Sequence, residues 1–124
     1  MEVNANEYQE AAARTLISEP DHSFAGNELM LMWCALGLGG ETGEVLDILK
    51  KTICHQHGDV RSVESRIKVR DELGDLMWYV ASIATLMDIS LDAIMERNIA
   101  KLKQRYPTGY SSDDSKARVD ITRL

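Results

Sequence analysis

Two short segments carry pairs of carboxylates at a spacing that suits cation binding. One contains Glu41 and Glu44, and the other contains Glu72 and Asp75. Residues three apart on an α-helix project from one face about one turn apart, so each pair would form an acidic patch. If the two helices pack face to face, four carboxylates meet and repel one another unless cations lie among them. Such hard oxygen ligands suit Mg²⁺, Mn²⁺ or Ca²⁺, so we expect a metal site here.

Pairs of this kind also occur on solvated helix faces, where the charge is only surface. Two features favour the metal site. Both pairs adjoin glycine, and both lie inside otherwise apolar helical segments that are neighbours along the chain. A metal held by carboxylates can bridge phosphate oxygens and lower the pKa of an attacking water. This chemistry would let an acidic protein bind a polyanion.

The elements that must position these residues are predicted to be four helices. Asn4 and Glu7 form a possible capping box, Ser90 is a candidate N-cap, and Pro107 stops the last helix. No run of alternating residues predicts a strand. Short connections between helices are typical of an all-α, four-helix bundle-like domain. The helices are expected at about residues 4–17, 27–52, 62–87 and 90–106.

The segments between and after these helices are predicted from their polar and turn residues. Residues 18–26 form a connecting loop, and residues 54–59 form a polar linker. We expect one domain over residues 1–110 and a polar C-terminal tail over residues 111–124, with an extended or partly disordered chain from residue 108 onward. A helix break near Gly39 and Gly40 is the alternative to a continuous second helix.

Composition limits the classes of function. The formal net charge of −6 argues against a general nucleic-acid binder, although a local basic patch can still meet phosphate. Cys34 and Cys54 form no CxxC pair, which is typical of reduced thiols in a cytosolic protein. Neither a signal-peptide pattern nor an apolar run of the ~20 residues needed for a membrane span is present. We therefore expect a cytoplasmic protein without membrane contact.

The ordered motifs resemble those of the MazG-type all-α nucleotide pyrophosphohydrolases. The resemblance lies in residues 38–45 (LGGETGEV), 71–79 (DELGDLMWY) and 101–111 (KLKQRYPTGYS), and it extends over roughly residues 4–118. It implies hydrolysis of a nucleoside triphosphate between the α and β phosphates, with Mg²⁺ as cofactor and Mn²⁺ as a possible substitute. It also implies that the metal ligands and catalytic residues are Glu41, Glu44, Glu72 and Asp75.

The family resemblance also bears on assembly and on the attacking water. Glu41 or Glu44 would orient that water. Members of the family usually form homodimers or homotetramers. The apolar first half of the second helix, residues 29–36, fits this expectation, since a helix apolar on all sides is buried in a core or at a subunit interface.

Nucleotide contacts are predicted on the basic and aromatic residues near the motifs. Asn98, Lys101 and Arg105 share one face of the last helix and could bind the β and γ phosphates. A solvated helix end that offsets the helix dipole is the alternative. Lys51 could reach a phosphate or be simply exposed. Tyr79 could stack on a base, as could Trp33 and Trp78, although large aromatic residues on apolar helices mostly belong to a core.

We therefore predict an enzyme that converts nucleoside or deoxynucleoside triphosphates to the monophosphate and pyrophosphate in nucleotide-pool clean-up. Its partner would be the nucleotide, not a nucleic-acid polymer. One alternative is a dUTP- or dCTP-selective hydrolase of the same superfamily. Two others are a non-catalytic helical adaptor with this fold and a metal-binding carboxylate bundle without hydrolytic chemistry.

Overall fold

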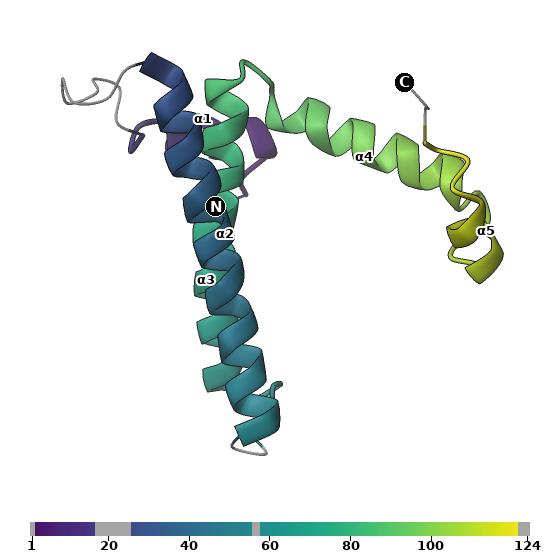
Figure 1. Cartoon of the computed structure of the whole chain (residues 1–124), viewed down its shortest axis with the longest axis horizontal. Coiled ribbons are helices and arrows are strands. Elements are labelled where there is room, and N and C mark those ends of the chain that lie inside the picture. The colour runs from purple at the N-terminus through teal and green to yellow at the C-terminus, as the bar shows by residue number, and fades with distance from the viewer. Residues whose placement is uncertain (1, 17–25, 56–57, 122–124) are drawn as a thin grey trace.

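The computed structural model describes residues 2–16, 26–55 and 58–121, and these residues fold into helices (Figure 1). Within these ranges there is no strand beyond one isolated bridge between Pro107 and Gly109. The all-α fold is therefore confirmed. The α-helices are α1 (Ala5–Ala13), α2 (Gly26–Lys50), α3 (Val63–Leu86), α4 (Leu91–Arg105) and α5 (Ser112–Ala117), and a π-helix, η1 (Lys51–His55), extends α2.

The helix starts follow the predicted caps. The side-chain carbonyl of Asn4 accepts the Glu7 N–H at 2.9 Å, and the Glu7 carboxylate accepts the Asn4 N–H at 3.2 Å, so the capping box is formed. The Ser90 hydroxyl accepts the Ala93 N–H at 3.1 Å at the start of α4. The first helix ends earlier than predicted, at Ala13.

The second helix is continuous through all of its glycines, so the alternative of a break near Gly39 is wrong. Residues 54 and 55, predicted as linker, instead belong to η1. The predicted loop at residues 18–26 and the centre of the predicted linker lie almost wholly outside the described residues.

The hairpin of α2 and α3 is the longest part of the molecule, and α1 packs against α3 (Figure 1). A small buried cluster of Ala12, Ala81 and Leu91 joins α1, α3 and the first residue of α4. Beyond this corner α4 leaves the hairpin, because the axes of α3 and α4 differ by 104°. The core therefore lies at one end of the hairpin. Residues 91–121, which we call the α4 arm, project from it.

Many apolar side chains remain exposed on this open shape. Met30 and Cys34 of α2 are buried, as expected for part of that helix, but Leu36 is 70% exposed and Met32 is 58% exposed. On α4, Met95, Ile99 and Leu102 form an exposed stripe at helical spacing, together with the less exposed Ile94. A single chain thus leaves apolar faces of both α2 and α4 in contact with water.

The end of the chain is folded as far as residue 121. Ser111 caps α5 through the Asp114 N–H at 3.0 Å, and Asp120 is buried against Arg105 of α4. The expectation of an extended or disordered chain from residue 108 is therefore wrong for residues 112–117. The sequence signal was present, because Ser111 and Asp114 form a helix start, but the segment is too short for periodicity to show it.

Among the described residues, no single helix is long and apolar enough to cross a bilayer. Only α3 and α4 taken together, across their 104° bend, meet that length and composition.

Candidate metal centre

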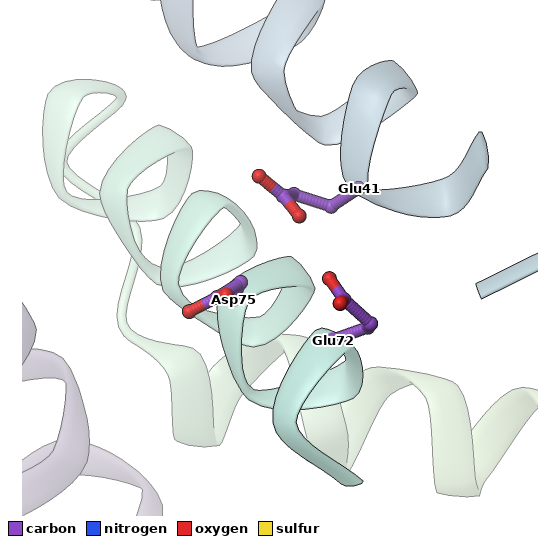
Figure 2. Close-up of side chains that lie close together, drawn as sticks. All are labelled: Glu41, Glu72 and Asp75. Atoms are coloured by element: carbon purple, nitrogen blue, oxygen red, sulfur yellow. The ribbon is translucent and has the colours of Figure 1, made fainter. Parts of the chain in front are cut away.

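Three of the four predicted ligands come together on the hairpin. Glu41 projects from α2, and Glu72 and Asp75 project from α3 toward the same point (Figure 2). One carboxylate oxygen from each lies within 4.8 Å of the others. The antiparallel packing of α2 and α3 creates this cluster, which we call the carboxylate trio. Glu41 and Glu72 are partly buried and Asp75 is exposed, so the trio opens to solvent on one side.

The charges of the trio act on one another. The pKa of Glu72 is raised, first by its burial and then by the negative charges of Glu41, Glu44, Asp75 and Asp71. A bound cation would reverse that repulsion, and an all-oxygen donor set is what Mg²⁺, Mn²⁺ and Ca²⁺ prefer. The chemistry of the residues present therefore fits a divalent cation.

The fourth predicted ligand, Glu44, lies one turn further along α2 and outside the trio. Its side chain is exposed, but its charge is felt by both Glu72 and Lys51. Glu44 is thus close to the trio, but its carboxylate is not among the three that lie within 4.8 Å of one another. Its catalytic and metal-binding roles stay predictions.

A cavity of about 370 Å³ adjoins the trio, and half of its lining residues are aromatic. Glu41 and Asp75 form one wall, and Trp33, Tyr79, Trp78 and Thr15 form the remainder. The Tyr79 ring packs edge-on against both indoles, with centroid distances of 6.2 Å to Trp33 and 5.0 Å to Trp78. Such a cavity offers flat apolar faces directly beside the carboxylates.

Thr15, which lies in the turn after α1, lines this cavity and was not among the predicted site residues. Its hydroxyl accepts a hydrogen bond from the Trp78 indole N–H at 2.7 Å and donates to the Ala12 carbonyl at 2.8 Å. The bond fixes the indole orientation at the cavity wall. No pattern assigned Thr15 a role at this site, because its partner lies 63 residues away in the sequence.

Glycine at position 37 makes room for Tyr79. A Cβ atom on Gly37 would lie 2.2 Å from Tyr79 Cε1 and 2.3 Å from Cζ. The ring therefore occupies the space that any other residue at position 37 would need. The close approach at Gly37 is therefore made by a side chain of α3.

The predicted phosphate-binding residues fall into two places. Lys51, in η1, stays on the hairpin and pairs with Asp47, which raises the pKa of Lys51; the charge of Glu44 adds to this effect. Asn98, Lys101 and Arg105 lie on the α4 arm, which extends away from the hairpin in Figure 1. The chain does not bring these three residues to its own carboxylate trio.

Arg105 already has a carboxylate partner. Its Nε and Nη2 atoms donate to the two carboxylate oxygens of Asp120, whose side chain is 1% exposed. The pair raises the pKa of Arg105 and lowers that of Asp120. The phosphate role of Arg105 stays a prediction, and the structure shows a bidentate ion pair inside the α4 arm.

The described chain is an all-α hairpin that places facing acidic motifs beside a cavity with three aromatic residues. The model of the MazG nucleotide pyrophosphohydrolase domain matches residues 33–110, and the chain belongs to that family. It is also 37% identical over 102 residues to the Gene 37 protein of Mycobacterium phage L5, a match covering 82% of this chain and 88% of that protein. No solved structure matches the chain.

Proposed function

We propose that this protein hydrolyses nucleoside or deoxynucleoside triphosphates between the α and β phosphates, with Mg²⁺ as the resident cation and Mn²⁺ as a substitute. Family membership supports a nucleotide pyrophosphohydrolase. The observation that supports the proposed reaction is that the carboxylate trio and the aromatic cavity share two residues. Glu41 and Asp75 belong both to the carboxylate trio and to the aromatic cavity. A nucleotide with its base in the cavity would have its phosphates beside the trio.

Each residue then has a distinct task. Glu41, Glu72 and Asp75 hold the cation, and Tyr79 with Trp33 offers faces for the base. When bound, a divalent cation neutralises phosphate charge and lowers the pKa of an attacking water. Glu44 lies beside the trio but outside it, which supports a role for its carboxylate in orienting that water and taking its proton.

The reaction balances without a further reactant. The water oxygen forms a new bond to the α phosphorus. The bond from the α phosphorus to the oxygen that bridges the α and β phosphates breaks. The bridging oxygen keeps the electron pair, so pyrophosphate and the nucleoside monophosphate are the products. Lys51, which follows α2 and interacts with the charge of Glu44, stabilises the negative charge of the departing pyrophosphate.

We further propose that the site is completed in a homodimer or homotetramer. The solvent-accessible surface of the chain is 9585 Å², whereas a compact monomer of this mass would expose about 6,700 Å². The excess is of the size that obligate subunits bury. The exposed apolar faces of α2 and α4 supply suitable contact surfaces, and a second copy could bring Asn98 and Lys101 to the trio.

The test is a pyrophosphate-release assay with the standard ribo- and deoxyribonucleoside triphosphates and dUTP, with Mg²⁺, with Mn²⁺ and with a chelator. Product analysis separates monophosphate plus pyrophosphate from diphosphate plus phosphate. Metal-dependent pyrophosphate release over many bases is the expected result and fits nucleotide-pool clean-up. A strong preference for dUTP or dCTP would assign the selective alternative. No turnover by the folded protein would favour the non-catalytic adaptor.

A further inference from the structure

The corner between α3 and α4 is held by side chains of α1. The helix α3 ends with Asp88 in the left-handed conformation (φ 55°), and the Ile89 N–H returns to the Ala84 carbonyl at 2.9 Å. This turn stops α3, and Ser90 starts α4 two residues later. These local contacts leave several polar backbone groups of the corner without a partner in the turn itself.

Gln9 of α1 satisfies those groups. Its side-chain amide donates to the Ile89 carbonyl at 2.9 Å and to the Thr85 hydroxyl at 3.2 Å, and its carbonyl accepts the Leu91 N–H at 2.6 Å. One side chain thereby contacts the end of α3, the turn and the first residue of α4. Leu91 is 3% exposed, so its N–H has little access to water and depends on Gln9.

Asn6, one turn earlier on α1, extends this contact. Its side-chain carbonyl accepts the Asp92 N–H at 3.4 Å, and Ser90 accepts the Ala93 N–H. The first three amides of α4 therefore donate to three side chains, two of which come from α1. Helix starts are usually capped by nearby residues or by water, so capping by a distant helix ties the direction of α4 to the position of α1.

We propose that Gln9, assisted by Asn6, is a positioning residue that fixes the direction of the α4 arm and with it the placement of Asn98 and Lys101 for substrate. The second half of this inference rests on the proposed function. The first half does not, because it concerns only the corner. The α1 helix is well placed for this task, since the hydroxyl of its Tyr8 donates to the Gly74 carbonyl beside the carboxylate trio at 3.4 Å. Thr15, in the turn that follows α1, accepts the indole N–H of Trp78.

The experiment compares Gln9→Ala and Asn6→Ala with Glu10→Ala in the full chain. A cavity of about 410 Å³ at the corner is lined by Asn6, Gln9 and Glu10. Glu10 is exposed, so it is a matched control. Alanine is the best helix former, so the variants should keep α1 helical. Amide hydrogen exchange is measured at Leu91 and Asp92. Affinity for a non-hydrolysable nucleoside triphosphate and for Mn²⁺ is measured on the same samples.

In Gln9→Ala, exchange at Leu91 should rise about five- to tenfold, the effect of losing a typical hydrogen bond. Nucleotide affinity should fall by a similar factor, while Mn²⁺ affinity stays unchanged because the trio lies on the hairpin. Asn6→Ala should affect Asp92 more than Leu91, and it carries the test if Gln9→Ala does not fold. Glu10→Ala should change none of these quantities.

Two results would overturn the inference separately. Unchanged exchange at Leu91 and Asp92 in both variants would show that α1 does not hold the corner. Faster exchange with unchanged nucleotide affinity would show that the direction of α4 does not matter for substrate. If the wild-type protein instead binds no nucleotide and releases no pyrophosphate, the proposed function fails, while the exchange data still decide the role of Gln9.

Discussion

The hairpin of α2 and α3 carries the acidic half of the predicted site, and the α4 arm carries the basic half. The hairpin brings its acidic residues together within one chain, where Glu41 meets Glu72 and Asp75. The α4 arm carries Asn98 and Lys101 away from that cluster (Figure 1). Helix pairing within one chain is therefore enough to assemble a carboxylate cluster whose chemistry fits a cation. In the proposed function, the basic half of the site would depend on the angle of α4 and on a second copy of the chain.

The two regions also differ in how their charges are balanced. The carboxylate trio concentrates negative charge, and the pKa of Glu72 is raised accordingly. On the α4 arm, Arg105 is neutralised internally by Asp120. The hairpin therefore concentrates negative charge in one place, whereas the end of the arm pairs the charges of Arg105 and Asp120 with each other.

The largest effect is expected from breaking the hairpin half. Glu72→Gln removes one of the three carboxylates of the trio and should lower metal-dependent kcat by at least about 10²-fold, because a partly buried, preorganised charge is lost. Helical circular dichroism should be retained, since the trio repels itself without metal. Glu64→Gln is the control, because Glu64 is exposed on the same helix and pairs with Lys68. Wild-type turnover by Glu72→Gln would remove Glu72 from the metal site.

The comparison with Glu44 sharpens this prediction. Because Glu44 lies outside the trio, Glu44→Gln should lower kcat while leaving Mn²⁺ affinity close to wild type. Equal loss of Mn²⁺ affinity in Glu44→Gln and Glu72→Gln would place all four carboxylates in the metal site.

The next effect concerns the arm. Lys101→Ala should weaken triphosphate binding about ten- to hundredfold, the range for losing a hydrogen bond to a charged group. If Lys101 acts on the partner's trio, co-refolding equal amounts of Lys101→Ala and Glu72→Gln should restore about a quarter of wild-type activity at low substrate. About half of the dimers would then be mixed, and each mixed dimer would have one intact site of two. No recovery in a mixture shown to exchange subunits would place Lys101 and Glu72 in the same chain's site, or Lys101 in none.

Smaller effects are expected from alanine at Gly37, which faces Tyr79, and at Gly40, which faces open space in the chain. Gly37→Ala would displace Tyr79 from between the two indoles, and we expect a loss of about 1–3 kcal/mol in stability together with weaker nucleotide binding. A Cβ on Gly40 meets nothing within 4 Å in the chain. Gly40→Ala should therefore stabilise α2 by up to about 1 kcal/mol if that face stays open. If a second copy packs there, Gly40→Ala should weaken the oligomer, as measured by light scattering and chemical unfolding.

The smallest effect on activity is expected at the end of the arm. The pKa of Asp120 is lowered by Arg105, so the folded chain holds the ionised form more strongly than the unfolded chain does. The stabilisation is therefore complete above the ordinary carboxyl pKa and is lost as pH falls through the lower pKa of the folded state. NMR shifts of α5 should change in that acidic range in the wild type. In Asp120→Asn they should already differ at neutral pH, and a wild-type α5 spectrum there would contradict the role of the pair.

The sequence predicted the features that depend on short-range geometry. The three-residue spacing of the carboxylates, the capping box at Asn4 and the start of α4 at Ser90 follow from the local physics of helices, and all four long helical segments were located from them. The short helix α5 was missed, because one turn and a half has no periodicity to detect.

The tertiary structure decided which of these residues meet. Residues three apart on a helix differ by about 60° around its axis and about 4.5 Å along it, so the register of the hairpin selects among them. On α3 that register presents both Glu72 and Asp75, but on α2 it presents Glu41 and leaves Glu44 outside. Likewise, the predicted helix bounds left a short connection at residues 88–89, but the contacts of Gln9 and Asn6 with the start of α4 join residues more than 80 positions apart. Contacts between such distant residues leave no periodic signal, because they form only after the helices have packed.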